Sequence, residues 1–244
     1  FTSTWAVVVS VVILLCLKFY NPIPLQTLQL KTFDLYQKFG NNYLSKSLVL
    51  VDISDESLGT YGQWPWKRDQ LGRAIIKAYQ NGAALVFLNV TFAHKDRLGG
   101  DEVFLKMISK YPVILTETKD LKNLQSIKRK VLGVGDVLIP VDVDGTIRKL
   151  PLENSVPETI LKIIKFPIPK QDDIWIDFRH QIPRIDHAEL DWSSVKGKIV
   201  FIGATFSGST YVLTPDGLKN THDIMAMSTE TLLSGKYITR PDWL

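Results

Sequence analysis

The chain has 244 residues, of which 45% are hydrophobic and 22% are charged, and its net charge is +4 at pH 7. These values are ordinary for a globular protein of one large or two modest domains, and they exclude a disordered or low-complexity chain. The positive charge is spread out, with no dense run beyond Lys128-Arg129-Lys130. The sequence therefore lacks the basic surface of a nucleic-acid-binding protein, and we expect no nucleic-acid partner.

The first segment of the chain, residues 1–17, contains no charged residue and is apolar almost throughout. As a helix it would be about 25 Å long, just short of the hydrocarbon core of a bilayer. Lys18, Phe19 and Tyr20 follow it with the cation and aromatic rings that are typical of a membrane interface. We predict a transmembrane helix over residues 1–20, clipped at its start, in preference to a buried core helix or a signal peptide. The lipid bilayer of the cell membrane is the partner that this segment implies.

Residues 21–46 are expected to connect this helix to the rest of the chain. Asn21-Pro22-Ile23-Pro24 interrupts the first helix, because two prolines in three residues cannot continue it. Apolar residues then recur at roughly helical spacing over residues 25–39. This pattern predicts an amphipathic connecting helix.

Residues 47–240 are interpreted as one α/β domain. Residues 47–53 and 84–92 are nearly continuous apolar runs, which are typical of strands that are covered on both faces. Residues 68–80, between them, have the periodicity of an amphipathic helix. A right-handed crossover through this helix predicts that the two strands are parallel.

The alternation of strands and helices continues along the chain. Residues 131–143 and 146–152 flank Asp144-Gly145, a dipeptide suited to a tight turn, and we predict that they form a β-hairpin insertion. The predicted fold class is α/β, with a mainly parallel sheet flanked by helices, the hairpin insertion and one preceding transmembrane helix. Residues 241–244 are predicted to begin a following membrane segment. Further helices are predicted at 101–110, 157–164 and 223–233, and further strands at 113–116, 174–178 and 198–202.

Two acidic residues at the end of the first predicted strand are candidate ligand-binding residues. Asp52 and Asp55 could bind a cation or act as acid and base. Asp55 could instead begin a short helical turn, because acidic residues favour helix N-termini. Thr205, after the apolar run 198–202, and Met225, on the last predicted helix, are further candidates, although methionine often fills gaps in a core.

Trp64 and Trp66 flank a proline in the loop after that strand and complete the candidate set. Their rings could form a platform for a sugar or a cationic ligand. The same rings could equally pack between the first helix of the domain and a neighbouring layer. Both interpretations remain open at this point.

Motifs for catalysis, nucleotides and metals are missing. The chain contains no G-x-S-x-G, no G-x-x-x-x-G-K-[ST], no G-x-G-x-x-G and no H-E-x-x-H. We therefore expect no catalytic residue, no metal and no cofactor. Two alternatives stay open: a membrane-anchored α/β hydrolase that uses Asp52 with Ser207 or His222, and a structural module that docks a partner through exposed tryptophans.

Several segments of the chain, taken together and in order, resemble the second class of CHASE-type domains, the cyclase/histidine kinase-associated sensory extracellular domains. The resemblance covers nearly everything after the first helix. It is carried by these segments: Phe33-Asp34-Leu35, Val49-Leu50-Val51-Asp52-Ile53, Gly62-Gln63-Trp64-Pro65-Trp66, Gly100-Asp101, Val143-Asp144-Gly145-Thr146-Ile147-Arg148, Ile182-Pro183-Arg184-Ile185, Lys198-Ile199-Val200-Phe201-Ile202-Gly203-Ala204-Thr205, Thr214-Pro215 and Leu232-Leu233-Ser234-Gly235.

This resemblance implies an extracytoplasmic sensory domain, periplasmic or extracellular after about residue 20, in a multipass membrane receptor. The output of such receptors is an adenylate or guanylate cyclase, a kinase such as a histidine kinase, or a diguanylate cyclase, and no such domain is present in this chain. The chain itself is then not an enzyme. We expect an unknown small-molecule or protein signal, and a homodimer in which a change in packing between the connector and the last helix reaches the membrane spans.

Overall fold

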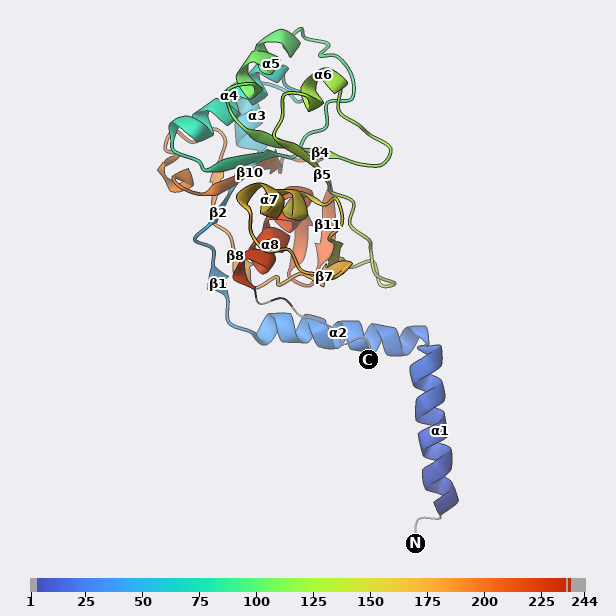
Figure 1. The fold of residues 1–244 in the computed structure, drawn as a ribbon. Coiled ribbons are helices and arrows are strands. Elements are labelled where there is room, and N and C mark those ends of the chain that lie inside the picture. Colours follow the sequence, from blue (N-terminus) through green and yellow to red (C-terminus); the bar gives the residue numbers. More distant parts are fainter. Residues whose placement is uncertain (1–3, 236, 238–244) are drawn as a thin grey trace.

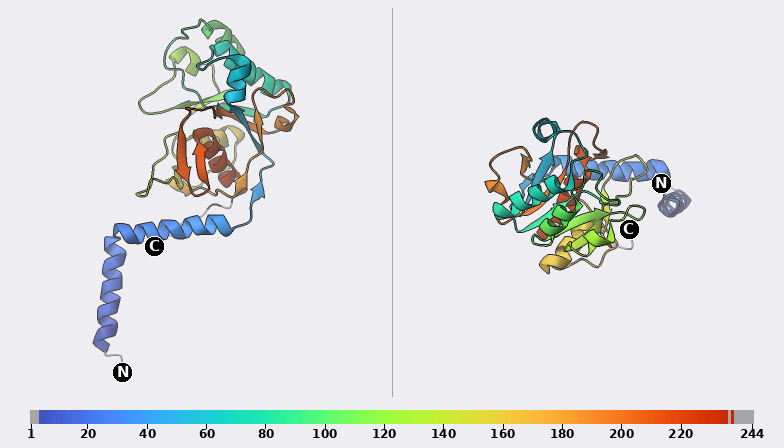
Figure 2. Two further views of the ribbon diagram at one scale, coloured as in Figure 1. Left: turned by 180° about the vertical axis from the view of Figure 1, so that it is seen from behind. Right: turned by 90° about the horizontal axis from the view of Figure 1, so that it is seen from above.

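The structure is a computed structural model that describes residues 4–235 and residue 237. Two helices, α1 (Thr4–Tyr20) and α2 (Ile23–Phe39), precede an α/β domain. The domain packs on one side of α2, and α1 leaves on the other side (Figures 1 and 2). The membrane segment predicted at residues 241–244 lies outside the described residues.

A sharp corner joins α1 to α2, whose axes are bent by 79°. Asn21 adopts a left-handed conformation with φ of 41°, which asparagine tolerates better than most residues. The backbone N–H of Asn21 still donates to the carbonyl of Leu17 at 2.9 Å. The carbonyl of Leu17, in the last turn of α1, is therefore satisfied. Pro22 then supplies the N-cap of α2, and proline is well suited to the start of a helix.

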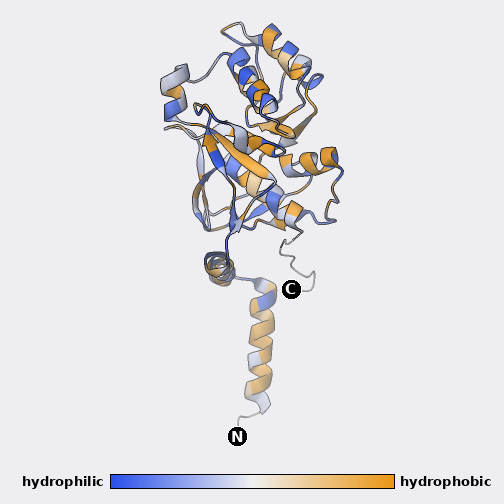
Figure 3. Ribbon diagram, turned by 90° about the vertical axis from the view of Figure 1, so that its left-hand side faces the viewer, coloured by the Kyte–Doolittle hydropathy of each residue, from blue (hydrophilic) through white to orange (hydrophobic). Residues whose placement is uncertain are grey.

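Among the described residues no single helix is both long and apolar enough to cross a bilayer, although α1 and α2 together satisfy that length and composition as a bent pair. None of the described residues of α1 is buried, and the helix is hydrophobic along most of its length (Figure 3). The transmembrane helix over residues 1–20 therefore stays a prediction.

The domain is built on a six-stranded sheet in which every pairing is parallel. Its strand order is β5-β4-β3-β10-β2-β9. The first two predicted strands, β2 and β3, are parallel as expected, but β10 lies between them and pairs with both. The strands are β2 (Leu48–Ile53), β3 (Leu85–Leu88), β4 (Val113–Glu117), β5 (Gly133–Asp136), β9 (Arg184–Asp186) and β10 (Ile199–Ala204).

Helices cover both faces of this sheet, so its strands are buried on both sides, as their continuous apolar sequences predict. We call the two sides the α4 face and the α8 face. The α4 face carries α3 (Asp55–Tyr61), α4 (Arg68–Gln80), α5 (Asp101–Ile108), α6 (Gln125–Lys128) and a 3₁₀ turn at Ser193–Val195, and the α8 face carries α7 (Val156–Ile164) and α8 (Thr221–Ser234) (Figure 1).

Alternation along β2 decides which side chain serves which face. Val49 and Val51 belong to the core of the α4 face, whereas Leu48 and Leu50 belong to the core of the α8 face. Because side chains of a strand alternate, Asp52 follows Leu50 onto the α8 side. The end of this strand is therefore apolar on one side and acidic on the other.

The predicted hairpin over residues 131–152 is wrong. Asp144-Gly145 does form a turn, with φ of 79° at Gly145, but the flanking strands join different sheets. Residues 133–136 form β5 and pair with β4, while β6 (Lys149–Pro151) pairs with β7 (Asp173–Trp175). The hairpin in the structure is β11 (Tyr211–Thr214) with β12 (Gly217–Asn220), and a short parallel pair joins β1 (Tyr43–Leu44) to β8 (His180–Gln181).

Candidate functional site

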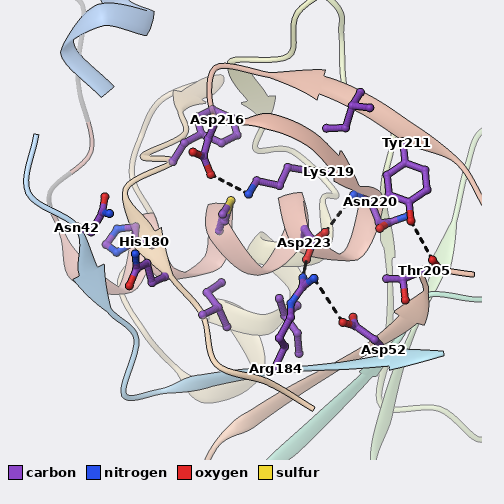
Figure 4. Close-up of a pocket in the computed structure, with 16 residues that line it drawn as sticks. Asn42, Asp52, His180, Arg184, Thr205, Tyr211, Asp216, Lys219, Asn220 and Asp223 are labelled. Carbon is purple, nitrogen blue, oxygen red and sulfur yellow. Dashed lines mark hydrogen bonds and ion pairs between the residues drawn. The ribbon is translucent and has the colours of Figure 1, made fainter. Parts of the chain in front are cut away.

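A cavity of about 490 Å³ opens on the α8 face at the end of β2 (Figure 4). In open parallel sheets, ligands bind at the carboxyl ends of the strands, and this cavity has that position. We call it the pocket. Its walls come from β2, β9, the loop after β10, the hairpin β11–β12, the start of α8 and the segment 178–182.

Arg184 projects into the middle of the pocket from β9 (Figure 4). Its guanidinium bonds to the carboxylate of Asp223 on α8 and lies 3.4 Å from that of Asp52 on β2. The side chain of Arg184 is 50% exposed, whereas those of Asp52 and Asp223 are 12% and 4% exposed. One accessible cation thus holds together two nearly buried carboxylates, and a charged ligand entering the pocket would compete directly for these groups.

His222 lies beneath this ion pair and is fully buried. Its Nε2 is 3.0 Å from Oδ1 of Asp52, while its Nδ1 has no hydrogen-bond partner within the described residues. The ring fits because Gly203 on β10 faces it: a Cβ at position 203 would lie 2.3 Å from Nδ1 of His222. The sheet therefore leaves space for this imidazole behind Asp52, which lines the pocket.

The hairpin and α8 share a residue, which fixes the remaining wall. Asn220 ends β12 and is also the N-cap of α8, where it forms a capping box with Asp223. The backbone N–H of Asn220 donates to Oδ2 of Asp223 at 3.0 Å, and its side-chain amide donates to the carbonyl of Thr210 at 3.1 Å. Movement of the hairpin would therefore act on the start of α8.

Two of the predicted ligand-binding residues, Asp52 and Thr205, do line the pocket. The hydroxyl of Tyr211 on the hairpin donates to the carbonyl of Thr205 at 2.8 Å and joins these two walls. Met225 is fully buried in the core of the α8 face, and its neighbour on the same helix, Met227, lines the pocket in its place. Both positions fit the gap-filling role of methionine.

Asp55 does not line the pocket. It occupies the first position of α3, as the alternative interpretation expects, and Ser54 caps that helix. The carboxylate of Asp55 accepts hydrogen bonds from Ser207, from the backbone N–H at 3.0 Å and from the hydroxyl at 2.7 Å. Ser207 thus serves to tie the loop after β10 to α3.

Trp64 and Trp66 lie on the α4 face, on the opposite side of the sheet from the pocket. Trp66 is 5% exposed, and its indole N–H donates to the carbonyl of Gly62 at 2.7 Å. Trp64 packs against Phe206, with ring centroids 5.8 Å apart, and the two tryptophans contact each other at 5.8 Å. These contacts agree with the interpretation in which both tryptophan rings pack between neighbouring layers.

The same aromatic cluster encloses His187, which is 4% exposed. Its ring lies 4.8 to 5.9 Å from those of Tyr61, Trp66 and Trp192, centroid to centroid. Burial disfavours the charged imidazolium, nearby Lys77 adds repulsion, and together they lower the pKa of His187 to about 4. This histidine is therefore neutral at physiological pH.

A second buried charge cluster lies where α2 meets the α8 face of the domain. Arg148 is fully buried and donates two parallel hydrogen bonds, at 2.7 and 2.8 Å, to the carboxylate of Asp34 on α2. It also bonds to Asp142 at 3.0 Å and to Asp144 at 2.7 and 2.8 Å. The hydrogen bonds from Arg148 hold the pKa of Asp144 well below its usual range. We call these four residues the Arg148 cluster.

Other contacts on the same side of α2 reinforce this attachment. Phe33 packs against Trp175 of β7, with ring centroids 4.6 Å apart. The side-chain carbonyl of Gln37, which is buried, accepts a hydrogen bond from the backbone N–H of Phe178 at 3.0 Å. The connecting helix is therefore docked on the domain along one face.

The Arg148 cluster is also bonded to the pocket hairpin. The backbone N–H of Ile147, next to Arg148, donates to the carbonyl of Leu213 on β11 at 2.8 Å, and Thr146 forms a β-bridge with the same residue. A continuous chain of bonded groups therefore runs from the hairpin through residues 146–148 to Asp34 of α2. Sequence reasoning did not assign functional roles to Arg148 or Arg184.

A family model for the CHASE2 domain matches residues 6–244, which is nearly the whole chain. Searches of curated proteins and of solved structures found no match. CHASE2 domains are extracellular sensory domains of signalling receptors and are not catalytic domains. The resemblance inferred from the sequence is thus confirmed, and the chain belongs to the CHASE2 domain family.

Proposed function

We propose that this chain is the extracytoplasmic sensory part of a multipass membrane receptor, with α1 in the membrane, and that it binds a small polar molecule in the pocket. The observation that carries the proposal is the bonded route from the pocket hairpin to α2 through the Arg148 cluster. A sensor needs both a site and a mechanical connection to the membrane. Here the wall of the site and the attachment of the connecting helix share one stretch of backbone, residues 146–148.

The mechanism follows from the groups that a ligand would meet. A ligand carboxylate or phosphate would compete for Arg184, and a ligand amine would compete for Asp52 or Asp223. Either change alters the contacts that position β9, the hairpin and the start of α8 relative to one another. Because the hairpin is bonded to residues 146–148, the change reaches Asp34 and shifts the packing of α2 on the domain.

The hydrolase alternative gains no support from the site. His222 does contact Asp52, but it is fully buried, and Ser207 is bonded to Asp55 instead. A nucleophile hydrogen-bonded to an accessible base is the geometry that such an enzyme needs. The partner-docking alternative needs exposed tryptophans, and Trp66 is buried.

Ligand binding is tested with the whole chain in lipid nanodiscs by thermal-shift screening against amino acids, dicarboxylates, sugars and nucleotides. We expect at least one class to raise the melting temperature of the wild type and to lose this effect in Arg184→Gln. The matched control is Arg73→Gln on the outer surface of α4, where the side chain is 72% exposed. A ligand that protects the wild type and Arg184→Gln equally would show that the pocket is not the site.

Coupling to α2 is tested by a reducible thiol-to-thiol crosslink in the complete receptor, in a Cys16→Ala background. Phe33→Cys and Trp175→Cys, joined by a bis-maleimide with an internal disulfide, would link α2 to β7 across the space that the two contacting rings fill in the wild type. We expect the locked receptor to stop responding to its signal and to recover on reduction, while each single-cysteine variant responds normally. An output that still follows the signal in the locked form would disprove the proposed mechanism.

A further inference from the structure

We propose that α2 lies on the surface of the lipid bilayer and that its side opposite the domain contacts the lipid interface. This inference rests on the proposed function, because it takes α1 to be inserted in the membrane. It adds a second membrane contact, made by the helix that carries the Arg148 cluster.

One face of α2 is apolar and uncovered within the described part of the chain. Leu28, Leu35 and Phe39 are spaced by seven and four residues, which places them on one side of a helix. Their exposed fractions are 64%, 54% and 81%. At about 100° per residue this side lies opposite the one that carries Asp34 and Gln37, which contact the domain.

The corner between the helices directs that apolar face toward the membrane. The break consists of Asn21 and Pro22, and two residues span at most about 7 Å. With α1 inserted, the 79° bend therefore holds the axis of α2 close to the membrane surface and nearly parallel to it. The domain lies on the other side of α2 from α1 in Figure 1, in the left view of Figure 2 and in Figure 3, so the uncovered face points to the side from which α1 extends.

The composition of this face suits a lipid interface. Leucine and phenylalanine on one side of a helix, with lysines beside them, are typical of helices that lie at the boundary between headgroups and acyl chains. Lys38 lies beside the face at an exposed position. Lys31 is 59% exposed but is ion-paired with Asp34 and Asp144 at 3.5 and 3.4 Å. Anionic headgroups would therefore attract Lys38 first. A second copy of the chain is the competing occupant, but it would have to fill the space that the bilayer around α1 occupies.

The test places a bimane fluorophore at single cysteines and measures its quenching by brominated lipid. The whole chain is reconstituted in nanodiscs of phosphatidylcholine and phosphatidylglycerol. The native Cys16 reports on α1, and Leu28→Cys or Leu35→Cys in a Cys16→Ala background reports on the apolar face of α2. Leu190→Cys is the matched control, since Leu190 is a leucine that is 97% exposed on the domain.

We expect brominated lipid to quench the labels at positions 28 and 35, and to leave the label at position 190 unchanged. Labels at 28 and 35 that are as unquenched as that at 190, while Cys16 is quenched, would overturn the inference and leave the insertion of α1 intact. Efficient disulfide formation between two copies of Leu35→Cys, with no quenching, would identify a second copy as the occupant. An unquenched Cys16 would instead refute the membrane part of the proposed function, and this inference with it.

Discussion

The two faces of the sheet are covered by different kinds of side chain. The α4 face is closed mainly by aliphatic side chains and by an aromatic cluster of Trp64, Trp66 and Trp192 around neutral His187. It also buries Arg68, which pairs with Asp101, and Glu117, which pairs with Lys128. The α8 face buries many polar groups, and α8 itself buries His222 and Asp223 along with serine and threonine side chains. The pocket and the Arg148 cluster both belong to this second side.

This difference indicates which face of the sheet we expect to rearrange when a ligand binds. Apolar packing is non-directional, and close-packed side chains cannot be rearranged without a loss of stability. A buried network of charges depends on every partner staying in place, and losing one partner leaves another uncompensated. We therefore expect the α4 face to serve as a rigid support and the α8 face to be the side that rearranges under the proposed function.

Removing Arg148 is the strongest way to break the α8 face. Arg148→Met leaves Asp34, Asp142 and Asp144 close together with only the exposed Lys31, 3.5 Å from Asp34 and 3.4 Å from Asp144, to balance them. We expect a loss of about 3–5 kcal/mol in the free energy of unfolding. Urea unfolding in detergent micelles, followed by tryptophan fluorescence, measures it. Arg73→Met is the control, because an exposed arginine should change stability by less than about 0.5 kcal/mol. Equal costs for the two variants would contradict the role of the cluster.

Acid should destabilise the α4 face through His187. Its pKa is about 4 in the folded protein and about 6.5 when unfolded, so between these values only the unfolded state takes up the proton. The contribution of neutral His187 to the free energy of unfolding is fully present above pH 6.5. It falls by about 3 kcal/mol in total as the pH drops toward 4. Denaturation at a series of pH values should show this slope in the wild type. His187→Gln should lose it, and an unchanged slope in that variant would assign the effect to other groups.

The contact between the sheet and His222 is tested by adding one methyl group. Gly203→Ala puts a Cβ within 2.3 Å of the ring and should cost about 1–3 kcal/mol. Gly59→Ala is the matched control, since nothing lies within 4 Å of a Cβ there and the position is helical. That control should be neutral or stabilise by up to about 1 kcal/mol. A neutral Gly203→Ala would contradict a tight contact between the sheet and the ring of His222.

Arg184 should matter least for stability. Its side chain is half exposed, and when it is replaced Asp223 keeps the hydrogen bond from the N–H of Asn220 and Asp52 keeps its contact with His222. Arg184→Gln should therefore cost less than about 1 kcal/mol in urea unfolding. Arg184→Gln should also abolish the rise in melting temperature that a ligand causes. Trp66→Phe, on the α4 face, should lower stability and keep that rise, which would separate the roles of the two faces. Loss of protection in Trp66→Phe at full stability would move the site to the α4 face.

Elements with a strong local signal could be predicted from the sequence alone. The strand predicted at residues 47–53 is β2 at Leu48–Ile53, and the helix predicted at residues 68–80 is α4 with those bounds. Their apolar patterns depend only on neighbouring residues and on which faces are covered. The error at residues 131–152 has the opposite cause. The turn at Asp144-Gly145 is local, but the partner of β6 is β7, and strand pairing is set by tertiary packing.

The candidate site shows the same division. Asp52 and Thr205 could be found because residues at the carboxyl ends of parallel strands meet at one edge of the sheet. Arg184 lies in a three-residue strand, too short to have a periodic pattern. His222 meets Asp52 across 170 positions, and Arg148 meets Asp34 across 114. No spacing rule connects residues that only the folded chain brings together.

The corner at Asn21 and Pro22 makes α1 and α2 act together as a lever. The two helices meet nearly at a right angle, and α1 is about 25 Å long. A rotation of α2 by about 10° about its own axis would swing the far end of α1 sideways by about 4 Å, provided the corner stays rigid. A sub-ångström rearrangement beside Asp34 would thus be magnified severalfold at the opposite end of α1, with no change in the fold of the domain itself.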